Sequence, residues 1–204
     1  RVPNIVGIDH PKVLSYLDVL QKRVEPGERV AIIGAGGIGF DVAEFLLHDV
    51  HEGPNPQSIE NFMAYWGVDM AFKNNGGLEK SVVSKPKRDV YLLQRKDSPV
   101  GRGLGLTTGW THRISLTKRD VKMLNAVTYQ RIDDHGLHIL VNNQAQLLEV
   151  DTIITCAGQE SNRKLFDSLS SAGHNVKLAG GAFQAAELDA KAAINQASYL
   201  AAAV

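Results

Sequence analysis

Three glycines at fixed spacing, Gly34, Gly36 and Gly39, are the residues of this chain best suited to chemistry. They follow a short apolar segment (residues 30–33) and open a second apolar segment with helical spacing. In a strand–turn–helix unit, the first glycine allows the tight turn, the second lets a pyrophosphate approach the backbone, and the third lets helix and strand pack closely. Free N–H groups at the helix start then hold the phosphates. The pattern predicts a dinucleotide site; the alternative is a glycine-rich turn that binds nothing.

Two cations, Arg95 and Lys96, end the next predicted strand (residues 89–96). An NAD site places a carboxylate there for the ribose 2′-hydroxyl, whereas a guanidinium fork and an ammonium suit a 2′-phosphate. The pair therefore favours NADP over NAD, unless both are ordinary cations of a solvated surface. Arg95 follows Gly39 at far more than the usual ~20 residues. The prediction thus depends on residues 49–88 being an insertion.

Weaker candidates lie at other strand and helix ends. Trp110, at the start of a helix predicted over residues 111–119, can stack on a flat ring or anchor a core or interface. Gly158 and Gln159 follow a strand predicted over residues 150–156, at the sheet edge where ligands of α/β folds gather. We interpret Cys156 as a buried apolar residue, because the chain holds no partner cysteine.

The histidine pairs at positions 48 and 51 and at 135 and 138 have no third ligand nearby, so we interpret them as surface residues and expect no metal site. His112 lies near the proposed site, but no Ser-His-Asp set or acid–base pair accompanies it. We therefore expect no catalytic residue in this chain, and interpret it as a binder of redox cofactors.

Apolar spacing predicts the elements that position these residues. We expect helices over residues 11–20, 58–66, 111–119 and 164–170, one from the glycine turn to near His48, and one from about Glu187, with Ser58 as an N-cap. We expect strands over residues 30–33, 89–96, 121–124, 127–132, 137–141, 146–149, 150–156 and 176–178. This order predicts an α/β fold, a Rossmann-like domain whose parallel sheet is crossed by a β-meander in place of one helix.

Composition narrows the class of protein. The 204 residues include 22 basic and 22 acidic side chains, so nothing points to nucleic acid or an anionic membrane. No apolar run approaches the ~20 residues that a bilayer span needs. A single cysteine favours a reducing compartment, and we expect a cytoplasmic protein. One cysteine also cannot hold a [4Fe–4S] cluster.

Several longer segments resemble one family of flavoproteins. They are residues 8–20 (IDHPKVLSYLDVL), 30–46, 92–96, 103–113 (GLGLTTGWTHR), 155–165 (TCAGQESNRKL) and 180–197. Together they resemble the C-terminal part of the bacterial NADPH-dependent 2,4-dienoyl-CoA reductases, old-yellow-enzyme-like proteins related to trimethylamine dehydrogenase. The segments at 8–20 and 103–113 are the most specific. The resemblance covers nearly the whole chain.

The resemblance implies a larger enzyme of several parts. An N-terminal TIM barrel would bind FMN and the dienoyl-CoA, a four-cysteine [4Fe–4S] site would follow, and an FAD domain would carry an inserted NADPH domain. Hydride would pass from NADPH to FAD. In this chain, residues 1–28 would be a lead-in from the FAD domain, residues 29–175 the NADPH domain with its insertion at 49–88, and residues 176–204 the return to the FAD domain.

The resemblance also implies roles for individual residues. The pyrophosphate would lie against Gly34, Gly36, Gly37, Ile38 and Gly39, and the 2′-phosphate against Arg95 and Lys96. Trp110 would lie near the nicotinamide–flavin junction. FAD would contact Gly180, Gly181 and the segment Glu187, Leu188 and Asp189. Two departures concern Ser161, where relatives have proline, and Gly181, where many have aspartate.

Two other hypotheses remain open on the residues alone. The chain could be a non-catalytic ADP-binding domain, as in some relatives of trimethylamine dehydrogenase, although ADP offers Arg95 and Lys96 no 2′-phosphate. It could also be a complete NAD(P) dehydrogenase. That hypothesis lacks support, because no Tyr-x-x-x-Lys set is present. By itself, the chain should not turn over a dienoyl-CoA, and should hold FAD weakly or not at all.

Overall fold

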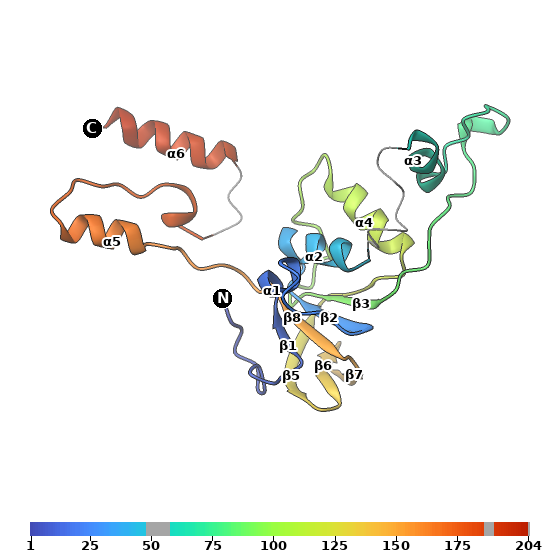
Figure 1. The fold of residues 1–204 in the computed structure, drawn as a ribbon, viewed down its shortest axis with the longest axis horizontal. Coiled ribbons are helices and arrows are strands. Elements are labelled where there is room, and N and C mark those ends of the chain that lie inside the picture. Colours follow the sequence, from blue (N-terminus) through green and yellow to red (C-terminus); the bar gives the residue numbers. More distant parts are fainter. Residues whose placement is uncertain (48–57, 186–189, 204) are drawn as a thin grey trace. The chain divides into compact units, whose positions relative to one another are not determined.

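The computed structural model of the chain describes residues 1–47, 58–185 and 190–203 (Figure 1). The chain divides into two compact units. One is Val2–Cys156, and the other is Ala157–Val204 together with Arg1. Across the described ranges, no helix combines the length and the apolar character of a membrane span.

A parallel five-stranded sheet forms the centre of the unit Val2–Cys156 (Figure 1). Its strands, in spatial order, are β1 (Val13–Ser15), β8 (Thr152–Thr155), β2 (Arg29–Ile33), β3 (Asp89–Leu93) and β4 (Lys122–Leu124). Every neighbouring pair in this sheet is parallel. The sheet confirms the predicted Rossmann-like α/β fold.

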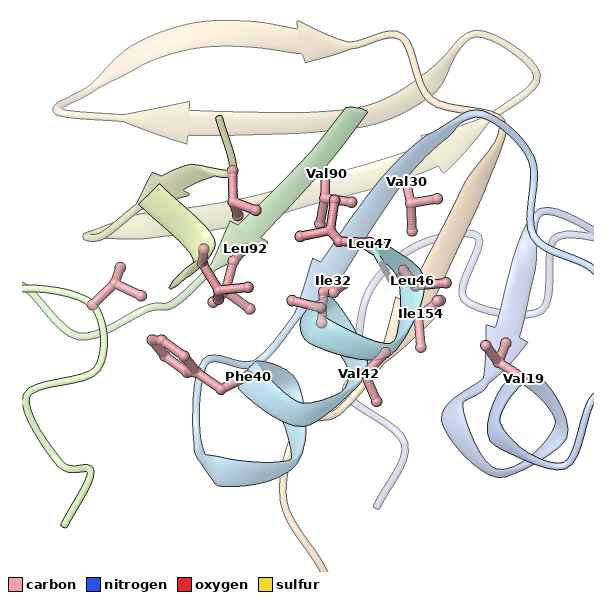
Figure 2. Close-up of a cluster of buried hydrophobic side chains, with 14 residues drawn as sticks. Val19, Val30, Ile32, Phe40, Val42, Leu46, Leu47, Val90, Leu92 and Ile154 are labelled. Atoms are coloured by element: carbon pink, nitrogen blue, oxygen red, sulfur yellow. The ribbon is translucent and has the colours of Figure 1, made fainter. Parts of the chain in front are cut away.

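Helix α2 (Gly37–Leu47) follows β2 and covers one face of the sheet (Figure 2). The short helix α1 (Tyr16–Leu20) and helix α4 (Gly109–Lys118) contribute buried side chains to the same core. Residues two apart on a strand share a face, so alternate residues of β2 and β3 meet the apolar side of α2. The contributing side chains include Val30, Ile32, Phe40, Val42, Leu46, Val90, Leu92 and Ile154.

The other face of the sheet is covered by a second, antiparallel sheet (Figure 2). It consists of β5 (Val127–Asp133), β6 (Gly136–Val141) and β7 (Gln144–Leu148), in that order. These strands connect β4 to β8, so the meander replaces a helical crossover as predicted. Successive residues of a strand point to opposite faces of the sheet. The buried residues that point away from α2 therefore face this second sheet; they are Ala31, Ile33, Leu93 and Ile153.

The insertion before β3 contains the predicted helix, α3 (Ile59–Trp66). The hydroxyl oxygen of Ser58 caps it by accepting a hydrogen bond from Asn61 N at 3.3 Å. A short 3-10 turn, η1 (Asn75–Gly77), follows. The buried carboxylate of Asp69 accepts three backbone hydrogen bonds, and the one from Asn74 N does most to lower its pKa. This carboxylate fixes the turn after α3.

The second unit contains three short elements. They are α5 (Lys164–Ser171), the 3-10 turn η2 (Gly180–Ala182) and α6 (Ala190–Ala202). The helices at 164–171 and 190–202 agree with the predicted ones, although the expected start near Glu187 lies outside the described residues.

Two predicted elements are wrong. Residues 13–15 form strand β1 where helical spacing predicted a helix, because Ile153 N donates to Lys12 O at 2.8 Å and draws this segment onto the edge of β8. Helix α1 starts only after Ser15, whose hydroxyl caps it. Residues 176–178 form no strand; they lead into η2 without a pairing partner among the described residues.

Candidate functional site

The glycine turn has the geometry that its spacing predicts. Gly34 has a φ of +113°, which only glycine adopts readily. A Cβ on Gly39 would lie 1.9 Å from the carbonyl oxygen of Gly34, so a side chain at position 39 would force strand and helix apart. Phe40 N donates to Gly36 O at 3.1 Å, which begins the helix at the turn.

The N-terminus of α2 is open to a ligand. An ideal Cβ on Gly37 would meet no atom within 4 Å, and no acidic side chain lies in the first turn. The first N–H groups of an α-helix have no partner inside the helix. Gly36, Gly37 and Ile38 therefore border a positively polarised end that suits an anion such as a pyrophosphate.

The cationic pair lies beside this turn. Strands β2 and β3 are paired with Ile33 opposite Leu93, so Gly34 and Gln94 leave the sheet next to each other. Arg95 and Lys96 then follow at the surface, and both side chains are exposed. Within the described part of the chain, neither side chain has a hydrogen bond or an ion pair. The pairing confirms residues 89–93 as the second strand and resolves the long spacing from Gly39.

The phenol of Tyr129, on β5, lies within electrostatic reach of Arg95. Burial raises the pKa of Tyr129 well above its usual range, and the positive charge of Arg95 opposes part of that rise. The phenol is therefore neutral at physiological pH. No local pattern in the sequence predicts that β5 approaches the cationic pair, because the approach depends on how the meander folds back.

The glycine-rich loop between β3 and α4 packs against α2. Gly101 has a φ of +80°, and a Cβ there would lie 2.7 Å from the ring of Phe40. The backbone of this loop is thus held close to the nucleotide-binding helix. Leu106 is fully exposed at its tip.

Trp110 belongs to a cluster of aromatic rings that joins α4 to the insertion. Its ring centroid lies 6.4 Å from that of Trp66 on α3, and its Nε1 donates to Thr107 O at 3.0 Å. The ammonium of Lys118 lies over Trp66, 4.9 Å from the ring centroid. Trp110 is still 56% exposed, so part of the residue remains accessible to a ligand.

Contacts that the sequence did not predict hold the C-terminal half of α2. Glu44 of α2 meets His112 of α4, with 3.0 Å between Oε1 and Nδ1. At the C-terminal end, Arg88 donates to Leu46 O at 3.1 Å and Arg119 donates to Leu47 O at 3.0 Å. Cations at this end complement the helix dipole. Only the fold brings these residues together, since they lie far apart in the chain.

Comparison with known proteins identifies the family. The model of the pyridine nucleotide-disulphide oxidoreductases matches residues 1–190. The chain belongs to this family. A metal reductase from Desulforamulus reducens is 23% identical over 173 residues, which cover 85% of this chain and 25% of that protein. A mercuric reductase from Staphylococcus aureus is 23% identical over 176 residues, which cover 84% of this chain and 25% of that protein.

Solved structures share the fold. A 2-naphthoyl-CoA reductase in complex with 2-naphthoyl-CoA superposes with a TM-score of 0.66 at 19% identity, covering 95% of this chain and 24% of that one. The 6-hydroxypseudooxynicotine amine oxidase of Pseudomonas geniculata N1 superposes with a TM-score of 0.64 at 16% identity, covering 98% of this chain and 25% of that one. The chain thus spans about a quarter of the length of these relatives.

The pyridine nucleotide-disulphide oxidoreductases bind FAD and NAD(P)H, and this chain is an oxidoreductase domain of that kind. The glycine turn and the open helix end fit the pyrophosphate of NAD(P)H, because a Cβ at Gly39 is excluded and the space above Gly37 is clear. No redox disulphide can form within the chain, since Cys156 is its only cysteine. Burial raises the pKa of the Cys156 thiol to about 12, which keeps it protonated and unreactive.

The remaining predicted residues of this oxidoreductase domain lie in the unit that begins at Ala157. Gly158 has a φ of +92° and is followed by the exposed Gln159. Gly180 N already donates to Gln196 Oε1 at 2.8 Å, whereas the space around Gly181 is open. Glu187, Leu188 and Asp189 lie outside the described residues.

Ser161, one of the two departures from the pattern of the resembled family, lies in the same unit. Its hydroxyl oxygen accepts a hydrogen bond from Ala185 N at 2.7 Å, and Arg163 Nη2 donates to Phe183 O at 2.8 Å. The serine therefore ties the turn to the segment after η2. The contact of this segment with FAD stays a prediction.

Proposed function

We propose that this chain is the NADPH-binding domain of a flavoprotein reductase. The observation that carries the proposal is the pairing of Ile33 with Leu93, because it places the glycine turn beside Arg95 and Lys96. A dinucleotide whose pyrophosphate lies at the start of α2 presents its adenosine ribose to the end of β3. Two free cations at that point suit the 2′-phosphate that distinguishes NADPH from NADH.

The residues of this chain have binding roles. The helix N-terminus holds the pyrophosphate, Arg95 binds the 2′-phosphate through its planar fork, and Lys96 adds a point charge. Trp110 is largely exposed, and its ring can stack against the nicotinamide. NADPH, when bound, supplies the hydride, and FAD is its acceptor in this proposal.

The full reaction extends the proposal beyond this chain. The segments at residues 8–20 and 103–113 support a 2,4-dienoyl-CoA reductase acting on unsaturated fatty acyl-CoA in β-oxidation. FMN and a [4Fe–4S] cluster would then belong to parts of the protein outside these 204 residues. A cytoplasmic location belongs to the same proposal.

Calorimetric titration of the chain with NADPH, NADH and ADP tests the proposal. We expect NADPH to bind most tightly, and Arg95→Ala to weaken NADPH binding by about 10- to 100-fold, the loss typical of a charge-assisted hydrogen bond. NADH binding should not change. Lys80→Ala, which removes an exposed lysine of the insertion, is the matched control.

Other outcomes of the titration would contradict parts of this proposal. Equal binding of NADPH and NADH would contradict the assignment of the 2′-phosphate to Arg95. Binding of ADP as tight as that of NADPH would favour a non-catalytic nucleotide domain. The preference for NADPH should also shrink at high salt, because both cations are exposed.

A further inference from the structure

The backbone that carries Arg95 and Lys96 is held on both sides by hydrogen bonds. Gln94 N donates to Leu124 O at 2.9 Å, and Gln94 O accepts from Val127 N at 3.0 Å. Beyond Arg95, the carbonyl oxygen of Lys96 accepts from Ala126 N at 2.9 Å. The segment after β4 therefore runs along residues 94–96 and holds the carbonyl groups of Gln94 and Lys96, which lie on either side of Arg95.

Two side-chain amides add to these backbone hydrogen bonds, and we call the whole set of bonds to residues 94–97 the brace. The Nε2 group of Gln94 donates to Lys96 O at 3.1 Å, contacts the carbonyl oxygen of Ser98, and lies 3.3 Å from the Ser98 hydroxyl. Asn125 Nδ2 donates to Asp97 O at 3.2 Å. The two amides thus bind carbonyl groups of the turn that presents the cations.

The brace holds the backbone and leaves the charges free. Within the described residues, the side chains of Arg95 and Lys96 have no hydrogen bond or ion pair, whereas the carbonyl groups of Gln94, Lys96 and Asp97 each accept a hydrogen bond. Such preorganisation lowers the entropy lost when a mobile cation is fixed on a ligand.

We infer that Gln94 and Asn125 are positioning residues that hold Arg95 and Lys96 in place for the 2′-phosphate of NADPH. The inference rests on the proposed function, since it assigns a task to the same site. In this inference both amides act through the carbonyl groups of the turn, and not by contact with the nucleotide. Their loss should therefore reduce discrimination between NADPH and NADH without affecting the pyrophosphate at the glycine turn.

The test measures dissociation constants of NADPH and NADH for the 204-residue chain and for Gln94→Met and Asn125→Ala. Methionine keeps the length of glutamine and removes the donor. We expect each variant to lower the ratio of NADPH to NADH affinity by about three- to tenfold, as for one neutral hydrogen bond. Gln144→Met, at an exposed glutamine of β7, is the matched control and should leave the ratio unchanged.

A double-mutant cycle gives a readout that a purely structural role would not move. In the Arg95→Ala, Lys96→Ala background, Gln94→Met should not change the ratio further, because the cations through which it acts are gone. Thermal unfolding of each variant shows whether the fold persists. Should Gln94→Met fail to fold, the milder Asn125→Ala decides the question.

The outcomes separate this inference from the proposed function. A wild-type chain that does not prefer NADPH would overturn both. The wild-type chain could prefer NADPH and lose that preference in Arg95→Ala, while Gln94→Met and Asn125→Ala change the preference by less than twofold. That result would overturn only the positioning role. An equal loss of NADPH and NADH affinity in these variants would also overturn it, since it would show support of the fold alone.

Discussion

The backbone N–H of Gly34 donates a hydrogen bond to the carbonyl oxygen of Leu93 across 2.9 Å. Gly34 is the first residue of the glycine turn, and Leu93 is the last residue of β3. This bond joins the turn that we propose binds a pyrophosphate to the strand end that precedes Arg95. The two halves of the candidate site are therefore parts of one continuous sheet edge, and their separation is set by the spacing of neighbouring strands.

Alanine at two glycines of the turn should have opposite effects. Gly39→Ala places a Cβ 1.9 Å from the carbonyl oxygen of Gly34, and we expect a loss of about 2–4 kcal/mol in the free energy of unfolding, together with loss of nucleotide binding. Gly37→Ala meets no protein atom, so stability should stay equal or rise slightly. Urea denaturation measures both variants.

Nucleotide binding by Gly37→Ala then separates the ligand from the fold. A methyl group at position 37 stands where the pyrophosphate should approach, so NADPH affinity should fall in a chain that is stable. Normal affinity in Gly37→Ala would show that the pyrophosphate does not cross this residue.

The fluorescence of Trp110 should report the nicotinamide end of the ligand. With Trp66→Phe, Trp110 is the single tryptophan of the chain, and with Trp110→Phe only Trp66 remains. We expect NADPH to quench Trp110 more strongly than 2′,5′-ADP does, because the latter has no nicotinamide to stack on the ring. Trp66 should respond less to either ligand. Equal quenching of Trp110 by both compounds would place the ring away from the nicotinamide.

The stability of the meander should depend on pH through Asp133. Burial alone would raise the pKa of this carboxyl, but hydrogen bonds from Arg131 Nε (3.1 Å) and His135 N (3.0 Å), with His138 nearby, lower it to about 2. A carboxyl with a lowered pKa stabilises the fold above its unfolded pKa near 3.8, and that contribution is lost as pH falls toward 2.

Asp133→Asn tests this dependence. The variant should unfold at a lower temperature than wild type at pH 7, and the difference should shrink between pH 4 and pH 2, where the wild-type carboxyl also becomes neutral. Thermal unfolding across this range measures it. A difference that stays constant down to pH 2 would mean that Asp133 acts through its shape and not its charge.

Cys156 should resist thiol reagents in the folded chain. Burial raises its pKa from 9.0 to about 12, so very little thiolate exists at pH 8. We expect alkylation by iodoacetamide to be at least about 100-fold slower in the native chain than in urea, because only the thiolate reacts. Fast labelling of the native chain would reveal an exposed thiol and reopen a redox role.

The sequence predicted the parts of this fold that rest on local chemistry. The strand, turn and helix around Gly34 each have their own signal, as do the capped helix after Ser58 and the hairpin turns of the meander. The edge strand at Val13–Ser15 was missed because its three residues share the spacing of the helix that follows. Its partner β8 lies more than a hundred residues away in the chain, and pairing at that distance leaves no local pattern.

Some residues of the candidate site could also be predicted from the sequence, and others could not. Gly34, Gly39 and Arg95 could be found from residue types at strand ends, because an α/β sheet collects such ends at one edge. Gln94 and Asn125 could not be recognised as partners of this edge. Their amides act on backbone carbonyls, and any polar side chain can do that once the fold brings it near.

Arg88 holds the end of the insertion close to the point where the insertion begins. It lies just before β3, and it reaches back to Gly27 O at 3.2 Å and to Leu46 O at 3.1 Å. The chain therefore leaves the Rossmann-like core and re-enters it at one corner. Each doubling in the length of such an excursion costs only about 0.6 kcal/mol of closure entropy. The insertion can therefore change in length while the sheet edge that carries the candidate site keeps its geometry. Searches for related sites should align the ends of the strands and not the number of residues between them.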